Sequence, residues 1–89
     1  MAKVIIEKLT EEQITKRGIR KWPIWKKEVS RFDHIYDSEE ECLFLEGHVI
    51  IETKEQTYTI NPGDFVTFQN GLACVWDIKK PVKKHYNFK

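Results

Sequence analysis

Alternation of apolar and polar residues is the main pattern in this chain from about residue 28 onward. Three segments show it most clearly, at residues 30–36, 40–44 and 72–78, where every second residue falls on one face. A period of two residues is typical of β-strands, whose side chains point alternately to opposite sides of a sheet. The pattern therefore predicts several short strands, each with one face directed to a core.

Glycine and proline mark the turns between these segments. Gly47 is expected to end one strand and begin another, and Pro81 is expected to open the last strand, at residues 82–88. In Asn61-Pro62-Gly63-Asp64, Gly63 is free to adopt a positive φ, and Asn70-Gly71 is typical of a hairpin turn. Short strands separated by such turns predict an all-β jelly-roll barrel over about residues 28–88.

The first 27 residues show a different pattern. Thr10-Glu11-Glu12-Gln13 is a capping box, which predicts one short helix near residues 11–17, ended by Gly18. Val4-Ile5-Ile6 predicts a short strand before it. Trp22-Pro23-Ile24-Trp25 predicts an extended edge segment, with both indole rings over one open end of the barrel. We expect a single domain over residues 1–89, with the helix and Trp-containing segment at residues 10–27.

Composition limits the classes of partner. Fifteen Lys and Arg residues against fourteen Asp and Glu give a net charge of +1, which argues against binding to nucleic acid. The chain has no apolar run long enough for a membrane span and no signal-peptide pattern at its start. Its two cysteines are expected to be reduced thiols, which is typical of a cytoplasmic protein. The basic stretch at residues 79–85 is interpreted as a solvated edge strand.

Eleven aromatic residues are more than a chain of 89 residues easily buries. Leu43 and Leu45 add an apolar outer face to one predicted strand. We therefore expect a homodimer, with edge strands near the N-terminus as the contact.

Two groups of residues resemble the two motifs of the cupin superfamily. Matches to the first motif are His34, Tyr36, Glu40 and Gly47. Matches to the second are Gly63, Gln69 at a proline position, Gly71, Cys74 at a histidine position and Ile78 at an asparagine position. The chain is similar to small single-domain cupins related to the cupin domain of ureidoglycine aminohydrolase. It shares with them Trp22-Pro23-Ile24-Trp25 and Lys84-His85-Tyr86-Asn87.

The resemblance implies a site inside the barrel, made by His34, Tyr36, Glu40 and Cys74. One option is a divalent metal ion bound by these four residues. Another is chemistry without a metal, in which His34 activates Cys74 as a nucleophile, or Glu40 acts as a general acid. An aromatic box that raises the pKa of the Glu40 carboxyl would consist of Phe32, Phe44 and Trp76.

Three functions remain open at this point. The chain is interpreted first as an enzyme that acts on a small polar or nitrogen-containing metabolite held in the barrel. The alternative is a module that binds a small molecule without transforming it. A third is a scaffold whose purpose is its dimer surface. The histidine and glutamate retained at positions 34 and 40 favour the first two, since a scaffold needs neither.

Overall fold

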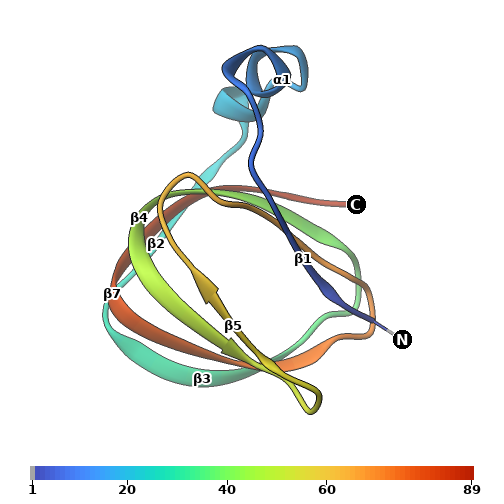
Figure 1. Cartoon of the computed structure of the whole chain (residues 1–89), viewed down its shortest axis with the longest axis vertical. Coiled ribbons are helices and arrows are strands. Elements are labelled where there is room, and N and C mark those ends of the chain that lie inside the picture. Colours follow the sequence, from blue (N-terminus) through green and yellow to red (C-terminus); the bar gives the residue numbers. More distant parts are fainter. Residues whose placement is uncertain (1) are drawn as a thin grey trace.

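The computed structural model describes residues 2–89 as a barrel of antiparallel strands with one short helix outside it (Figure 1). This confirms the predicted all-β fold with a helix near the N-terminus. The elements in chain order are β1 (Val4–Glu7), α1 (Glu11–Lys16), the 3-10 helix η1 (Ile19–Lys21), β2 (Ile24–Lys27), β3 (Ser30–Ile35), β4 (Glu40–Glu52), β5 (Thr57–Ile60), β6 (Phe65–Phe68) and β7 (Ala73–Phe88).

Two long strands, β4 and β7, run through both sides of the barrel and pair with each other along most of their length. The first part of β4 pairs with β6, and its last part pairs with β5. In the same way, the first part of β7 pairs with β3 and its last part with β2. β1 adds to the free side of β6. The sheet therefore begins before residue 28, because β1 and β2 are both part of it.

The predicted strand ends at Gly47 and Pro81 are wrong. Both residues lie inside continuous strands, where β4 shifts its register against β7. A Cβ atom at Gly47 would lie 2.8 Å from the Pro81 carbonyl oxygen and 2.8 Å from Val82 Cα. The two strands thus bend at the same point, and glycine permits their close approach.

The predicted hairpin at Asn70-Gly71 is also wrong, because β6 pairs with β1 and β4 and not with β7. The turn instead holds the end of β3. The Gly71 N–H donates to the Tyr36 carbonyl oxygen at 2.8 Å, and the Tyr36 N–H donates to the Leu72 carbonyl oxygen at 2.8 Å. Gly71 and Gly63 both have a φ of 92°, and the positive φ of Gly63 is as predicted.

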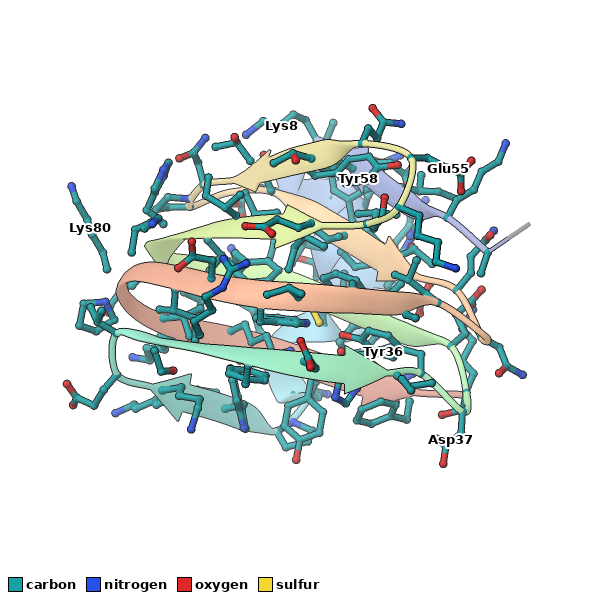
Figure 2. The ribbon with its side chains drawn as sticks, turned by 90° about the horizontal axis from the view of Figure 1, so that it is seen from below. Lys8, Tyr36, Asp37, Glu55, Tyr58 and Lys80 are labelled. Carbon is teal, nitrogen blue, oxygen red and sulfur yellow. The ribbon has the colours of Figure 1, made fainter. Side chains whose placement is uncertain are left out.

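The core lies between the inward faces of the strands. Even-numbered residues of β3 are half-buried while odd-numbered ones are exposed, as the alternation predicted. The inward faces of β4 and β7 contribute the large side chains of this core, with Phe68 from β6 beside them. Charged residues such as Lys8, Glu55 and Lys80 extend away from the barrel (Figure 2).

A second, smaller apolar cluster lies outside the barrel, where α1 and η1 cover one face. Ile14 and Ile19 pack there against Leu43 and Phe65. The capping box of α1 is present as predicted. This packing buries Leu43, which we expected on a surface shared between protomers.

Trp22 also belongs to the outer cluster, and only Trp25 packs against the barrel core. The expectation that both rings cover one end of the barrel is therefore wrong. Among residues 2–89, no helix has the length and apolar character needed to cross a membrane.

Candidate functional site

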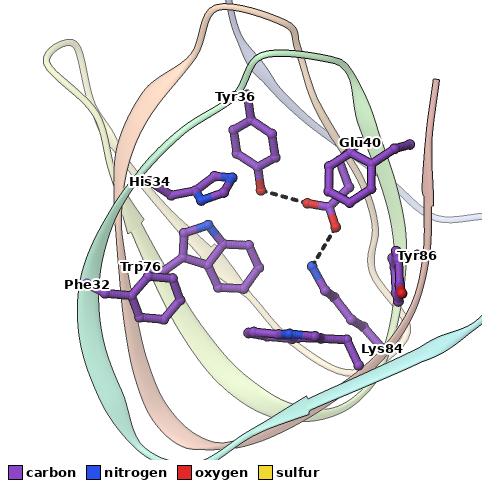
Figure 3. Close-up of a pocket in the computed structure, with 9 residues that line it drawn as sticks. Phe32, His34, Tyr36, Glu40, Trp76, Lys84 and Tyr86 are labelled. Carbon is purple, nitrogen blue, oxygen red and sulfur yellow. Dashed lines mark hydrogen bonds and ion pairs between the residues drawn. The ribbon is translucent and has the colours of Figure 1, made fainter.

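A cavity of about 220 Å³ opens inside the barrel (Figure 3). Its walls come from β2, from β3 and the residue after it, from the start of β4 and from both halves of β7, and most of the lining side chains are aromatic. The lining residues are Trp25, Phe32, His34, Tyr36, Glu40, Trp76, Lys84, Tyr86 and Phe88.

Five residues expected at the site line this cavity, namely Phe32, His34, Tyr36, Glu40 and Trp76. The other two do not. Cys74 pairs with His34 across β3 and β7 and is buried in the core. Phe44 is buried behind Trp76, with ring centroids 6.2 Å apart.

Glu40 is the centre of a buried polar network. Tyr36 Oη donates to Glu40 Oε1 at 2.7 Å, and Lys84 Nζ donates to Glu40 Oε2 at 2.9 Å (Figure 3). Lys84 Nζ also lies 3.3 Å from Cys42 Sγ. Glu40 and Lys84 are each only 4% exposed, so their opposite charges compensate each other in a site that water hardly reaches.

The Lys84 ammonium also lies against aromatic rings. Its Nζ is 4.6 Å from the ring centroid of Trp76, 4.8 Å from that of Trp25 and 5.8 Å from that of Phe44. Such cation–π contacts stabilise a charge that has lost its hydration. Trp25 reaches this position because it is the β2 partner of Lys84 on β7.

Four lining residues were not among those expected at the site, namely Trp25, Lys84, Tyr86 and Phe88, and Lys84 is the charged one. The stretch 79–85 was interpreted as a solvated strand because it is rich in lysine. The sequence nevertheless contained an indication that Lys84 is buried. Even-numbered residues of β7 face inward at Trp76 and Ile78, and after Pro81 they do so again at Val82 and Lys84. His85 is buried too, and its Nδ1 lies 2.9 Å from the Trp22 carbonyl oxygen.

The donor set does not fit the divalent metal considered above. No group of three or more His, Cys, Asp or Glu side chains within residues 2–89 is placed to hold a metal ion. His34, Glu40 and Cys74 therefore do not make such a group. Both Glu40 oxygens already accept hydrogen bonds, and the positive charge beside this carboxylate belongs to Lys84.

The cysteine and the tyrosine are held in their neutral forms. Burial, and then the negative charge of Glu40, raise the pKa of the Cys74 thiol to about 11. An activated nucleophile needs the opposite shift. Burial, again followed by Glu40, also raises the pKa of the Tyr36 phenol, which suits its role as a hydrogen-bond donor.

Glu40 does not lie in a purely aromatic box either. The expected box was to raise its pKa and keep it protonated. Instead the Lys84 ammonium contacts this carboxyl directly, at 2.9 Å. In this arrangement Glu40 accepts a hydrogen bond from Tyr36 and forms an ion pair with Lys84.

Two polar groups at the cavity have no hydrogen bond within the described residues. His34 contacts the Tyr36 ring, with centroids 4.3 Å apart, and neither ring nitrogen is bonded. The Trp76 indole nitrogen lies on the side of His34 (Figure 3). This N–H has no hydrogen-bond partner, and residues 2–89 contain no fully buried side-chain nitrogen or oxygen that lacks one. The indole nitrogen is therefore partly accessible. Both groups are available to a ligand.

A barrel of this topology, with its candidate site enclosed between the strands, has the cupin fold. A family model described as the EutQ-like cupin domain matches residues 14–86, which is most of the chain. The chain therefore belongs to the EutQ-like cupin family. No curated protein matches it.

Several solved structures are similar. A DUF861-family protein from Thermotoga maritima is 49% identical with a TM-score of 0.95, and the match covers 98% of this chain and 100% of that one. A DUF861-family protein from Pseudomonas syringae pv. tomato is 24% identical with a TM-score of 0.69, covering 74% and 29%. The EutQ protein of Clostridium difficile is 12% identical with a TM-score of 0.67, covering 98% and 68%. The last two share the fold.

Proposed function

We propose that this cupin binds a small, uncharged, single-ring molecule inside its barrel without a metal ion. The observation that carries the proposal is the Lys84–Glu40 ion pair at the wall of the cavity. A lysine ammonium here does what a metal cation would do for the glutamate, namely compensate its charge. The charge of Glu40 is therefore balanced by a protein side chain, without a metal ion.

The size and walls of the cavity support a ligand with one ring. An apolar cavity of about 150 Å³ in an engineered protein holds benzene. A cavity of about 220 Å³ therefore has room for a ring with one or two substituents. Aromatic faces from Phe32 and Trp76, which stack with centroids 6.0 Å apart, favour a flat ligand.

The electrostatics of the site support an uncharged ligand. Lys84 and Glu40 neutralise each other, so a charged molecule would enter a largely apolar space without a free counter-charge. His34 and the Trp76 N–H offer the unpaired polar contacts, which suit a carbonyl, hydroxyl or ring nitrogen. The small polar or nitrogen-containing metabolite expected from the sequence belongs to this class when it is uncharged.

Between the functions left open by the sequence, a binding module is favoured over a thiol-dependent or metal-dependent enzyme. The high pKa of Cys74 and the lack of a metal-donor group within residues 2–89 both count against those two mechanisms. Catalysis by a buried lysine beside a carboxylate is the enzymatic alternative that the site retains.

Tryptophan fluorescence of chelator-treated protein titrated with benzyl alcohol tests the proposal. We expect a saturable change for wild-type protein and for Trp22→Ala, since Trp22 lies in the outer cluster. Trp25→Ala removes a wall of the cavity and should weaken binding at least about tenfold, a loss of about 1.4 kcal/mol. Equal affinity for the two variants, or no saturation in any of them, would overturn the proposal.

A further inference from the structure

Lys84 differs from every other lysine of residues 2–89 in being buried. Lys84 also lines the cavity, and its nitrogen is directed towards Glu40 among the other lining side chains (Figure 3). Lys80, on the same strand, is exposed and points away from the barrel (Figure 2). A lysine amine at the wall of an apolar pocket is the group that forms imines with carbonyl compounds in many proteins.

We propose that Lys84 forms a covalent imine with a small aldehyde or ketone bound in the cavity, with Glu40 as the proton acceptor and donor. This inference rests on the proposed function, because the carbonyl compound must first occupy the cavity. It goes further by naming the chemical class of the ligand and the atom that it joins.

The step balances without any further reactant. The Lys84 ammonium gives one proton to Glu40 Oε2, which lies 2.9 Å away, and becomes a neutral amine. The amine nitrogen attacks the carbonyl carbon, so that a C–N bond forms and the π electrons move to oxygen. Through Glu40, one proton moves from nitrogen to this oxygen, which gives a carbinolamine.

The carbinolamine then loses water. Glu40 returns its proton to the hydroxyl group, the C–O bond breaks, and the nitrogen lone pair forms the C=N bond. The products are a protonated imine on Lys84, one water molecule and ionised Glu40. The carbonyl oxygen and two of the three ammonium hydrogens leave as that water, and nothing is oxidised or reduced.

The surroundings of Lys84 favour this product. A protonated imine carries the same positive charge as the ammonium, so Glu40 continues to compensate it. The faces of Trp25 and Trp76, whose centroids lie within 4.8 Å of Nζ, stabilise the imine cation as they do the ammonium. Tyr36 holds the other oxygen of Glu40 and fixes the carboxylate towards Lys84.

Reductive trapping tests the proposal on the full chain. The protein is incubated with benzaldehyde, or with the smaller propanal, in the presence of cyanoborohydride, and peptide mass spectrometry locates the alkyl group. We expect labelling of Lys84 to be at least about tenfold faster than that of Lys80, because the cavity holds the carbonyl group beside the amine. Benzyl alcohol, which fills the cavity but forms no imine, should slow labelling of Lys84 and leave Lys80 unchanged.

Variants separate the roles of the two residues. Glu40→Gln should slow labelling of Lys84 at least about tenfold, while Glu55→Gln, on the surface, should not. Labelling confined to exposed lysines, with benzyl alcohol still bound, would overturn the imine and leave the binding function standing. Labelling of Lys84 that benzyl alcohol fails to slow would also overturn it. If benzyl alcohol does not bind either, the proposed function itself fails.

Discussion

The side chain at position 84 determines the chemistry of the cavity. Removing two charges from water costs free energy, and a close partner recovers it only when the geometry is good. Lys84 and Glu40 meet this condition, with a 2.9 Å ion pair, a hydrogen bond from Tyr36 and aromatic faces around the ammonium. Such a pair is sensitive to the loss of either partner, because the other charge then remains buried.

We therefore expect Lys84→Met to lower the free energy of unfolding by about 3–5 kcal/mol. Lys80→Met removes an exposed lysine and should change it by no more than about 0.5 kcal/mol. The double variant Glu40→Gln with Lys84→Met should lose less than the sum of the two single changes, since no uncompensated charge remains. Urea unfolding followed by circular dichroism measures the wild-type protein, the three single variants and the double variant. Equal losses for positions 80 and 84 would contradict the account.

The buried thiol of Cys74 should make the stability of the protein depend on pH. Its pKa is about 11 in the folded protein against 9.0 for an ordinary cysteine, because burial and the charge of Glu40 disfavour the thiolate. Between these values the folded state keeps a proton that the unfolded state loses, so stability should fall as pH rises from 9 to 11. Cys74→Ala should make this fall smaller. Unfolding curves at several pH values check it, and an identical slope in the two proteins would refute it.

Alternation predicted which residues of β3 face inward, and together with the cupin resemblance it placed His34, and Tyr36 directly after the strand, at the cavity. It could not predict that Cys74 lies outside the lining, since burial and access to a cavity are different properties. Lys84 was missed because its neighbours in sequence are basic, and its environment depends on the partner strands β2 and β4.

At the scale of elements, the shape of the barrel depends on two bends that face each other in β4 and β7. Gly47 has a φ of 110°, and a side chain there would collide with the backbone of β7. The sequence predicted the positions of these irregularities correctly but assigned them to strand ends. A glycine or a proline marks a break in regular pairing, and only the partner strand decides whether the chain turns or bulges.

Gly47→Ala should therefore destabilise the protein more than Gly18→Ala. Both glycines have a positive φ, which costs alanine about 1–2 kcal/mol. A Cβ at Gly18 meets no atom within 4 Å, whereas one at Gly47 lies 2.8 Å from two backbone atoms. We expect the free energy of unfolding to fall by about 1–2 kcal/mol for Gly18→Ala and by clearly more for Gly47→Ala. Thermal or urea unfolding measures both losses. Similar losses would show that β4 and β7 do not approach closely at this bend.

At the scale of the whole molecule, the apolar surface that remains is smaller than composition suggested, because α1 covers the outer face of β4 and β6. Large apolar residues are still exposed, among them Ile6 on β1, Ile24 on β2 and Phe88 at the end of β7. β1 and β2 are also the two ends of the main strand order. We therefore keep the proposal that the chain forms a homodimer through these N-terminal edge strands.

Sedimentation equilibrium checks this proposal. We expect wild-type protein to have twice the chain mass of 10.7 kDa. Lysine in place of Ile6 or Ile24 should shift the equilibrium towards the monomer, because a charge on an edge strand opposes pairing. Val29→Lys is the control, since Val29 is exposed between β2 and β3. A wild-type monomer at high concentration would contradict the proposed dimer and would leave the proposed ligand binding in the cavity unaffected.

The central claim is that the barrel cavity binds an uncharged single-ring molecule without a metal. The three tryptophans provide its most direct test, because Trp25 and Trp76 line the cavity and Trp22 lies in the outer cluster. Chelator-treated, ¹⁵N-labelled protein is titrated with benzyl alcohol while the three indole N–H resonances are followed by NMR. The account predicts saturable shifts of the Trp25 and Trp76 signals, with the Trp22 signal unchanged. Three stationary signals, or shifts that appear only after a metal ion is added, would contradict it.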